Sequence, residues 1–347
     1  MRYDLAVVGG GPAGSVAAAV AARRGLRVIA FERGSFPRDK VCGEFVSSEA
    51  LPLLQTLAPR LCAAAPGIAR AAFVAPSGRR RGFDLLQPAL GISRLALDAA
   101  LWEAAAGAER RTRATVAAFE PEGSHWRLRL AGGETLAAAA VIVASGRSGR
   151  ASPWLGVKAR FHGLEAGAAV EMHLFRGGYC GLAPVENGWT NVCALIHRRR
   201  AGALGASRDF AAWISAASAS PALAQRLRPG RQATPTVVTA QLELGSRAGC
   251  RDGVLAAGDA SGFIDPFTGD GLARALLSGE LAADAIANGA TQAYPAALAR
   301  AAACGYTAAA PLRRLVQAPL RLQSLAAWAL ARPVVGPRLL AATRWRS

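Results

Sequence analysis

The chain has 347 residues, with 41 Lys and Arg against 23 Asp and Glu, a formal net charge of +18 and 52% hydrophobic residues. This length holds one large domain or two closely joined ones, and no apolar run is long enough for a membrane-spanning helix. Only two of the basic residues are lysine, and no arginine cluster alternates with aromatic residues. We therefore expect no nucleic-acid binding, and expect the charge to favour anionic surfaces or acidic ligands.

Cysteine and histidine are sparse. The six cysteines include no Cys-x-x-Cys pair, and the four histidines lie far apart, so neither a zinc site nor a disulfide framework is expected. No secretory signal pattern precedes the first expected strand, which starts almost at Met1. These features predict a cytoplasmic protein without a metal site.

The segment from Tyr3 to Arg33 predicts a strand, a glycine turn, an alanine-rich helix and a second strand. Gly9, Gly11 and Gly14 have the Gly-x-Gly-x-x-Gly spacing, which combines a tight turn, close approach of a pyrophosphate and close helix–strand packing. The unpaired N–H groups at the helix start would face the phosphates. Glu32 ends the second strand, where a carboxylate can accept hydrogen bonds from an adenosine ribose. The segment predicts a dinucleotide site.

The remaining pattern alternates between two kinds of unit. Residues 34–44 read as a loop, and the apolar run at 139–144 as a buried parallel strand. From residue 157 the pattern becomes antiparallel, and from Val254 it returns to the first unit with a buried strand and a helix over 271–288. The other expected elements are a helix at 47–61 capped by Ser47 or Ser48, strands at 68–75 and 79–85, a helix at 95–106 capped by Ser93, strands at 113–119, 125–131, 134–137, 166–176, 179–185 and 189–197, helices at 208–218 and 221–227, and an extended run at 234–244.

The last fifty residues are helical in pattern and are interrupted by four prolines. Between Leu298 and Ser347 there are eight arginines and no Asp or Glu, beside apolar residues that include Trp328 and Trp345. This mixture suits contact with an anionic membrane surface. The alternative is a set of helices that simply covers the nucleotide-binding unit, since each proline shortens the amphipathic face.

Four separated segments are expected to meet at one ligand: the glycine turn, the Cys42 loop, Arg94 with its helix, and Gly258-Asp259. Their order and motifs resemble the FAD-dependent oxidoreductases that share a two-domain fold with aromatic hydroxylases, and within them the geranylgeranyl reductase-like branch. The resemblance implies an α/β protein with a Rossmann-like FAD-binding domain of the glutathione reductase type 2-like class, an inserted antiparallel β-sheet substrate domain and a helical C-terminus. The implied bounds are 1–66, 91–156 and 245–295 for the FAD-binding domain, 67–90 and 157–244 for the substrate domain, and 296–347 for the basic C-terminal segment.

The most specific likeness is the segment from Ala257 to Leu272. In this family the Gly-Asp carboxylate, here Asp259, holds a ribityl hydroxyl of FAD. A Pro-x-x-Gly-x-Gly turn, here Pro266 to Gly271, brings helix-start N–H groups to the flavin N1 and O2, where reduction places negative charge. The residues that the resemblance assigns to the cofactor are Gly9, Gly11, Pro12, Ala13, Gly14, Glu32, Arg33, Cys42, Gly43, Arg94, Gly258, Asp259, Pro266, Gly269, Asp270, Gly271 and Leu272.

Two segments bear on catalysis. Residues 38–44, Arg-Asp-Lys-Val-Cys-Gly-Glu, resemble the reductases' Lys-x-Cys-Gly-Gly segment near the flavin ring, which implies that Cys42 flanks the substrate cavity as an acid, a thiolate or a small buried residue. Glu44 departs from the second glycine of that pattern. The segment from Tyr179 to Pro184 keeps the first and last residues of the reductases' Tyr-x-Trp-x-Phe-Pro but lacks its two bulky groups. Cys42 and Tyr179 are the expected catalytic residues, with His173 a further acid–base candidate in the cavity.

The resemblance implies hydride transfer between flavin N5 and an apolar lipid, isoprenoid or polyketide-type substrate, with NAD(P)H as a transient electron donor. One alternative is a monooxygenase that hydroxylates a phenolic ring through a C4a-hydroperoxide, although Ser145-Gly146 stands where those enzymes carry Asp-Gly. Flavin halogenases share the scaffold, but their Trp-x-Trp-x-Ile-Pro signature is absent. A flavin-binding module without turnover is a lesser alternative.

Overall fold

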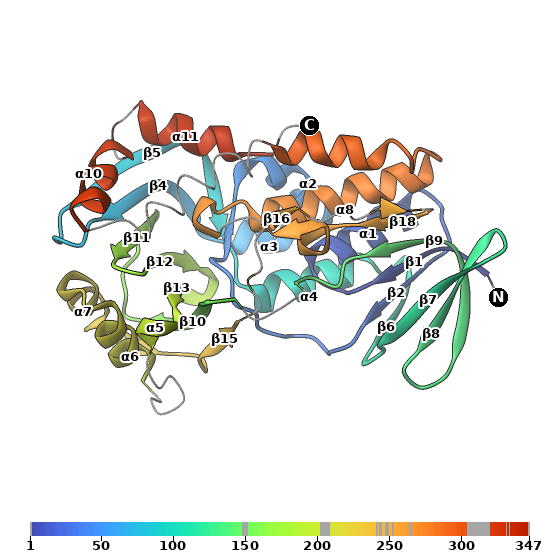
Figure 1. The fold of residues 1–347 in the computed structure, drawn as a ribbon, viewed down its shortest axis with the longest axis horizontal. Helices are drawn as coiled ribbons and strands as arrows, with labels where there is room; N and C mark the ends of the chain where they lie inside the picture. The colour runs from blue at the N-terminus through green and yellow to red at the C-terminus, as the bar shows by residue number, and fades with distance from the viewer. Residues whose placement is uncertain are drawn as a thin grey trace.

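The computed structural model describes residues 2–147, 152–201, 209–240, 242, 245–246, 250–251, 253–263, 266–303, 320–330, 332 and 334–345. These residues form an α/β fold of the Rossmann type that contains two large sheets. Figure 1 shows the two sheets toward opposite ends of the long axis, with the C-terminal helices along one side.

The first sheet contains the parallel strands that the N-terminal pattern predicts. Its order is β17-β18-β9-β1-β2-β6, and β1 pairs in parallel with both β2 and β9. The strand β2 is buried along its whole length, as expected for a parallel strand covered on both faces. The strands are β1 (Arg2–Val8), β2 (Val28–Glu32), β6 (Glu109–Thr112), β9 (Thr135–Val143), β17 (Cys250–Arg251) and β18 (Val254–Ala256), with β7 (Val116–Glu122) and β8 (His125–Leu130) attached as an antiparallel meander.

Helices cover one face of this sheet. The helix α1 (Pro12–Arg23) packs against α4 (Arg94–Ala104) and α8 (Gly271–Ala287). Against the other face pack apolar side chains of β8, among them Trp126 and Leu128. The expected meander, the Ser93 cap of α4 and the long helix from Gly271 are present, and the Ser93 hydroxyl accepts a hydrogen bond from the Ala96 N–H at 3.1 Å.

The second sheet is mostly antiparallel and has the order β14-β10-β13-β12-β11-β4-β5-β3. Alternate residues of its central strands point to opposite faces. On one face Phe161, Cys180 and Val192 pack with the helices α6 and α7. The strands are β3 (Phe45–Val46), β4 (Gly67–Val74), β5 (Arg80–Gly91), β10 (Trp154–His162), β11 (Ala169–Phe175), β12 (Gly178–Val185), β13 (Trp189–His197), β14 (Arg231–Gln232) and β15 (Val237–Thr239), and the helices are α5 (Arg198–Ala201), α6 (Phe210–Ser218) and α7 (Pro221–Leu227).

Several expected elements differ from the observed ones. The helix at 47–61 is interrupted: a short 3₁₀ turn leads into α2 (Leu51–Leu57), and a separate α3 (Pro59–Ala64) follows, because Pro59 has no N–H to continue the first helix. The Ser47 hydroxyl donates to the Glu49 carboxylate and does not cap the helix. The strands at 134–137 and 139–144 are the single strand β9, and β5 extends beyond residue 85 to Gly91. Within the described residues of the run at 234–244, only the short strand β15 is present.

The strands that were not expected include β6 and β10. In β10 the charged residues Lys158 and Arg160 alternate with apolar ones, yet both side chains are fully buried. The sequence pattern does not indicate that these charges are buried, because their ionic partners lie more than a hundred residues away in the chain.

The described C-terminal helices are residues 294–303, α10 (Leu320–Leu330) and α11 (Val335–Thr343); Pro311, Pro319 and Pro333 lie outside the described residues. Among the described residues, no helix is both long and apolar enough to cross a membrane.

The contact between α1 and α8 depends on a missing side chain. A Cβ atom at Gly279 would lie 2.3 Å from the Ala13 carbonyl oxygen. We expect Gly279→Ala to lower the free energy of unfolding by about 2 kcal/mol, although alanine is the better helix former, because backbone atoms cannot move aside as a side chain can. Gly67→Ala is the control, since its Cβ would meet nothing within 4 Å. Denaturant unfolding of both variants checks the prediction, and equal stabilities would contradict it.

Candidate functional site

The glycine turn between β1 and α1 is built on close backbone contacts. Gly9 has φ +110°, and its Cβ would lie 2.3 Å from the Ala144 carbonyl oxygen. A Cβ at Gly14 would lie 1.8 Å from the Gly9 oxygen. Beside Gly11 the space is open, since the nearest atom to its Cβ position is an Arg38 nitrogen at 3.8 Å. Among the residues that the structure describes, no side chain caps α1, so its first N–H groups can bind a ligand that approaches Gly11.

Glu32 lies buried at the end of β2, beside this turn. Its carboxylate accepts hydrogen bonds from the N–H groups of Gly10 at 2.8 Å and Gly34 at 2.9 Å, and it forms an ion pair with Arg38. Burial opposes ionisation, but the hydrogen bond from Gly34 and the charge of Arg38 lower the pKa of Glu32 below its ordinary value. Two oxygens accept up to four hydrogen bonds, so this fixed carboxylate keeps capacity for a ribose hydroxyl.

The Gly258-Asp259 segment lies directly against the glycine turn. Gly258 has φ +61°, its Cβ would lie 2.9 Å from the Ala13 Cβ, and its N–H donates to the Ser278 hydroxyl at 2.8 Å. The Asp259 carboxylate lies 3.5 Å from Arg147. Burial raises the pKa of Asp259, and the nearby cations oppose that shift.

Arg94 begins α4 at the same place. Its guanidinium forms a bidentate ion pair with Asp98, at 2.6 and 2.7 Å, which fixes its orientation. Burial works against the charge of Arg94, but Asp98 outweighs it and raises the pKa. The charge of Arg94 also influences the ionisation of Asp259, so the two predicted residues lie in one electrostatic environment.

The cations of this site that were not among the predicted residues include Arg38, Lys40 and Arg147. Burial, together with the like charges of Arg38 and Arg94, lowers the pKa of Lys40 to about 8. A bound anion would stabilise the charged form of Lys40 and so raise its pKa again. The sequence signal was available, since Arg38 and Lys40 lie in the loop that carries Cys42 and follows the end of β2.

The turn before α8 supplies a second open helix start. Gly269 has φ +73°, and its Cβ would lie 3.3 Å from the Phe45 ring. A Cβ at Gly271 would meet nothing within 4 Å, and Asp270 does not cap the helix with its side chain. The Asp270 carboxylate instead pairs with Arg344, and burial raises its pKa to about 6. The Asp270 side chain therefore binds the C-terminal segment through Arg344, whereas the backbone of Gly271 faces open space.

An apolar wall joins the second sheet to this turn. Tyr179 lies edge-on against Phe267, with ring centroids 5.1 Å apart, and Phe73 stacks on Phe267 at 6.0 Å. Phe267 belongs to the short 3₁₀ turn Pro266–Thr268 that leads into α8. The wall comprises Ala75, Leu174, Tyr179, Leu195, Leu242 and Phe267, with Phe73, Trp154, Met172 and Phe263 against them.

The predicted catalytic residues occupy different parts of the site. Tyr179 lies in the apolar wall, whereas Cys42 packs against the core of the first sheet. Burial raises the pKa of the Cys42 thiol, which favours the protonated form over the thiolate. The third candidate was misplaced: His173 lies on the opposite face of β11 from Leu174, 3.5 Å from Glu171, because strand side chains alternate.

Some predicted cofactor residues lie at the edge of the site. Arg33 is exposed, whereas Leu272 is a residue of α8 whose side chain is buried in the core of the first sheet. Pro12 and Ala13 are buried in the first turn of α1, where they shape the turn through their backbone. Gly43 and Pro266 are exposed.

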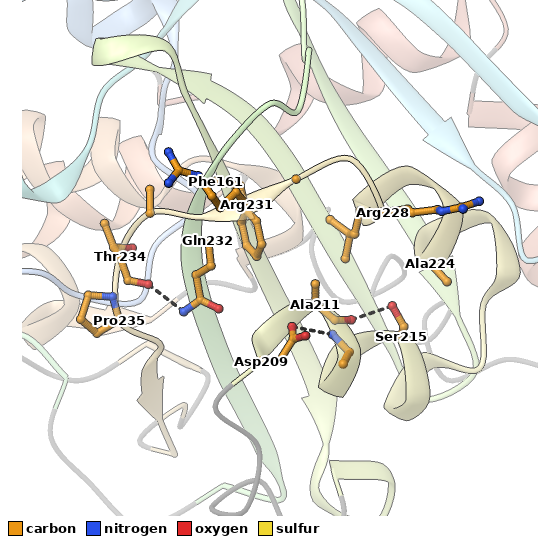
Figure 2. A pocket seen from close by; sticks show the side chains of 14 residues that line it. Phe161, Asp209, Ala211, Ser215, Ala224, Arg228, Arg231, Gln232, Thr234 and Pro235 are labelled. Carbon is orange, nitrogen blue, oxygen red and sulfur yellow. Dashed lines mark hydrogen bonds between the residues drawn. The ribbon is translucent and has the colours of Figure 1, made fainter.

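A large pocket lies elsewhere, on the face of the second sheet that α6 and α7 cover. It has a volume of about 790 Å³ and contains none of the predicted site residues. Figure 2 shows local hydrogen bonds of three polar side chains that line it: Asp209 accepts from the Ala212 N–H, Gln232 donates to the Thr234 carbonyl and Ser215 donates to the Ala211 carbonyl. These bonds hold helix and loop ends, and Arg228 and Arg231 also line the pocket.

The chain is similar to known oxidoreductases in sequence and in fold. The family model described as pyridine nucleotide-disulphide oxidoreductase matches residues 3–172. The chain is 28% identical over 328 residues to the digeranylgeranylglycerophospholipid reductase of Methanosarcina mazei, covering 82% of this chain and 75% of that protein. It is 26% identical over 336 residues to the conditioned medium factor receptor 1 of Dictyostelium discoideum, covering 82% of this chain but only 63% of that relative's length.

Solved structures share the fold at low identity. A geranylgeranyl bacteriochlorophyll reductase-like protein from Thermoplasma acidophilum superposes with a TM-score of 0.81 at 18% identity, covering 99% of this chain and 95% of that one. A flavin-dependent brominase gives a TM-score of 0.81 at 20% identity, covering 100% and 95%. The chain is thus similar to FAD-dependent oxidoreductases, among them a digeranylgeranylglycerophospholipid reductase by sequence and, by fold, a geranylgeranyl bacteriochlorophyll reductase-like protein and a flavin-dependent brominase.

Proposed function

We propose that this enzyme transfers a hydride between flavin N5 and an apolar substrate of the lipid, isoprenoid or polyketide type. The observation that carries the proposal is the apolar wall, because it places Tyr179 of the second sheet against Phe267 in the turn before α8. An apolar molecule held between the wall and a flavin would be shielded from water, as hydride transfer requires.

The residues present fit FAD. The pyrophosphate can approach the open backbone at Gly11, and the Glu32 carboxylate can accept a hydrogen bond from the adenosine ribose. The Asp259 carboxylate can bind a hydroxyl of the ribityl chain, and the N–H groups at Gly271 can stabilise negative charge at flavin N1 and O2. Bound FAD would supply the two-electron chemistry, with NAD(P)H as its transient donor.

Reduction of a carbon–carbon double bond needs a proton as well as the hydride. We propose Tyr179 and the protonated Cys42 as candidate donors, because both lie beside the segments assigned to the flavin end. The runner-up is hydroxylation of a phenolic ring. It is favoured by the aromatic character of the wall, since Phe73 stacked on Phe267 would also suit a planar ring.

Turnover with and without oxygen tests the proposal. The purified protein, loaded with FAD and bleached with NADPH under nitrogen, should regain flavin absorbance when a short-chain isoprenoid quinone or a geranylgeranyl lipid is added. The product should gain two hydrogens. Dependence on oxygen, with one labelled oxygen atom in the product, would instead establish the monooxygenase.

Lys40 makes FAD affinity depend on pH. Its pKa of about 8 in the free protein means that it carries its charge below that pH and loses it above. A bound phosphate raises this pKa, so FAD should bind more weakly as pH rises above about 8, by up to about tenfold per pH unit. Quenching of flavin fluorescence across this range measures the affinity. Lys40→Arg keeps its charge and should show no such decline; the same decline in both proteins would contradict the assignment.

We also propose that α10 contacts the surface of an anionic membrane, from which an apolar substrate could enter. Leu322, Leu325 and Trp328 are 46% to 60% exposed and follow one another at helical spacing. Arg332 lies over the Trp328 ring at 4.0 Å, beside this apolar stripe. Arginine and tryptophan together are typical of a helix at the lipid headgroup level.

Vesicle sedimentation tests this contact. The protein should sediment with vesicles of mixed phosphatidylcholine and phosphatidylglycerol, less with pure phosphatidylcholine, and less again at high salt. Replacing Leu325 and Trp328 together by serine should lower binding by about tenfold, because their apolar burial is lost. Val238→Ser is the control, since Val238 is similarly exposed on β15. Equal sedimentation with both vesicle types would refute the proposal.

A further inference from the structure

Four charged side chains meet between the loop that follows β2 and the strand β10. Asp39 and Glu44 come from the loop after β2, and Lys158 and Arg160 come from β10; we call them the buried quartet. Lys158 Nζ lies 2.8 Å from Glu44 Oε1, and Arg160 Nε lies 3.0 Å from Glu44 Oε2. Arg160 also holds Asp39 through two hydrogen bonds, at 2.9 and 3.0 Å. The side chains of Glu44, Lys158 and Arg160 have no exposure to solvent.

The quartet is electrically balanced, with two carboxylates and two cations. Burial opposes ionisation of Asp39, but Lys158 and Arg160 outweigh it and lower its pKa. Removing charges from water is costly, and apolar residues of similar volume often give equal or greater stability. Stability alone is therefore a weak reason for this arrangement, whereas the bonds fix the relative position of a loop and a strand.

Glu44 is constrained by its backbone conformation and by its partners. Its φ of +57° lies in the left-handed region, which favours glycine and is held in other residues only by surrounding contacts. Besides its two cations, its carboxylate accepts the Arg94 N–H at 2.7 Å, at the start of α4. Glu44 thus joins the loop to α4 and to β10 at once.

The segment held between Asp39 and Glu44 contains Cys42. The Cys42 carbonyl accepts a hydrogen bond from the Asn191 side chain of β13 at 3.0 Å. Val41 lies against β10, since a Cβ at Gly156 would be 2.9 Å from its Cγ1. The segment is consequently attached to the second sheet at both ends and in the middle.

We propose that Glu44 is a positioning residue, which binds Lys158 and Arg160 so that the Cys42 segment is held at a fixed place between the cofactor residues and the second sheet. The proposal rests on the proposed function only in that this segment borders the flavin. Its test does not require turnover.

Alkylation of the native, FAD-loaded protein by iodoacetamide, mapped by mass spectrometry, tests the proposal. Cys42 and Cys62 are both free and half-buried, so Cys62 serves as the internal reference. We expect Glu44→Gln to raise the alkylation rate of Cys42 by about tenfold and to leave that of Cys62 unchanged, because a local restraint is lost. The flavin absorption spectrum should shift as well, since its surroundings change.

A second variant tests the proposal in case Glu44→Gln does not fold. Glu44→Gly combined with Lys158→Met leaves Asp39 and Arg160 as a balanced pair, and glycine adopts the required φ without strain. This variant should keep its cooperative thermal unfolding and still expose Cys42. Asp84→Asn, which removes an exposed ion pair with Arg70, is the matched control and should change neither cysteine.

The outcomes separate the explanations. Faster alkylation of Cys42 alone in both variants supports the proposal, whether or not the substrate is the one proposed, because the double variant removes two charges that shift the pKa of the Cys42 thiol in opposite directions. An unchanged Cys42 rate in the folded double variant would overturn it. An equal rise at Cys42 and Cys62 would also overturn it, because Glu44 would then stabilise the fold in general and position nothing in particular.

Discussion

Close packing of backbone against backbone at the start of α1 is the constraint on which the cofactor site depends. Gly14 lies against the Gly9 carbonyl, Gly9 against Ala144, and Gly279 against Ala13. Side chains would separate these elements. Their absence brings β1, β9, α1 and α8 together and leaves the N–H groups at the helix start available to a phosphate.

One face of the second sheet contacts the segments around the cofactor site. This face has a charged half and an apolar half. Near β10, Lys158 and Arg160 bind the loop that follows β2. Near β11 and β12, aromatic and aliphatic side chains such as Tyr179 meet Phe267 before α8. The ionic contacts of the first half are directional, so they fix the distance and orientation of the groups that they join. The apolar contacts of the second half are not directional.

The same fold serves reductases and halogenases, so the fold does not select the reaction. Under the proposed function, the reaction of this chain would depend on the segment from Asp39 to Glu44, whose carboxylates bind Lys158 and Arg160, and on the wall that includes Phe73 and Tyr179. The protonated state favoured for Cys42 and the burial of Tyr179 are properties of these surroundings and not of the residue types.

The sequence by itself determined the local elements whose patterns are short in range: the glycine turn, α1, the Ser93 cap of α4 and the helix from Gly271. Glycine spacing, caps and apolar periodicity reflect contacts within a few residues, so they can be recognised without the fold. Only the tertiary structure decided that Asp270 turns to Arg344, that His173 faces away from the wall and that Lys158 and Arg160 are buried. The reason is that burial and charge partners depend on residues far apart in the chain, which no local pattern records.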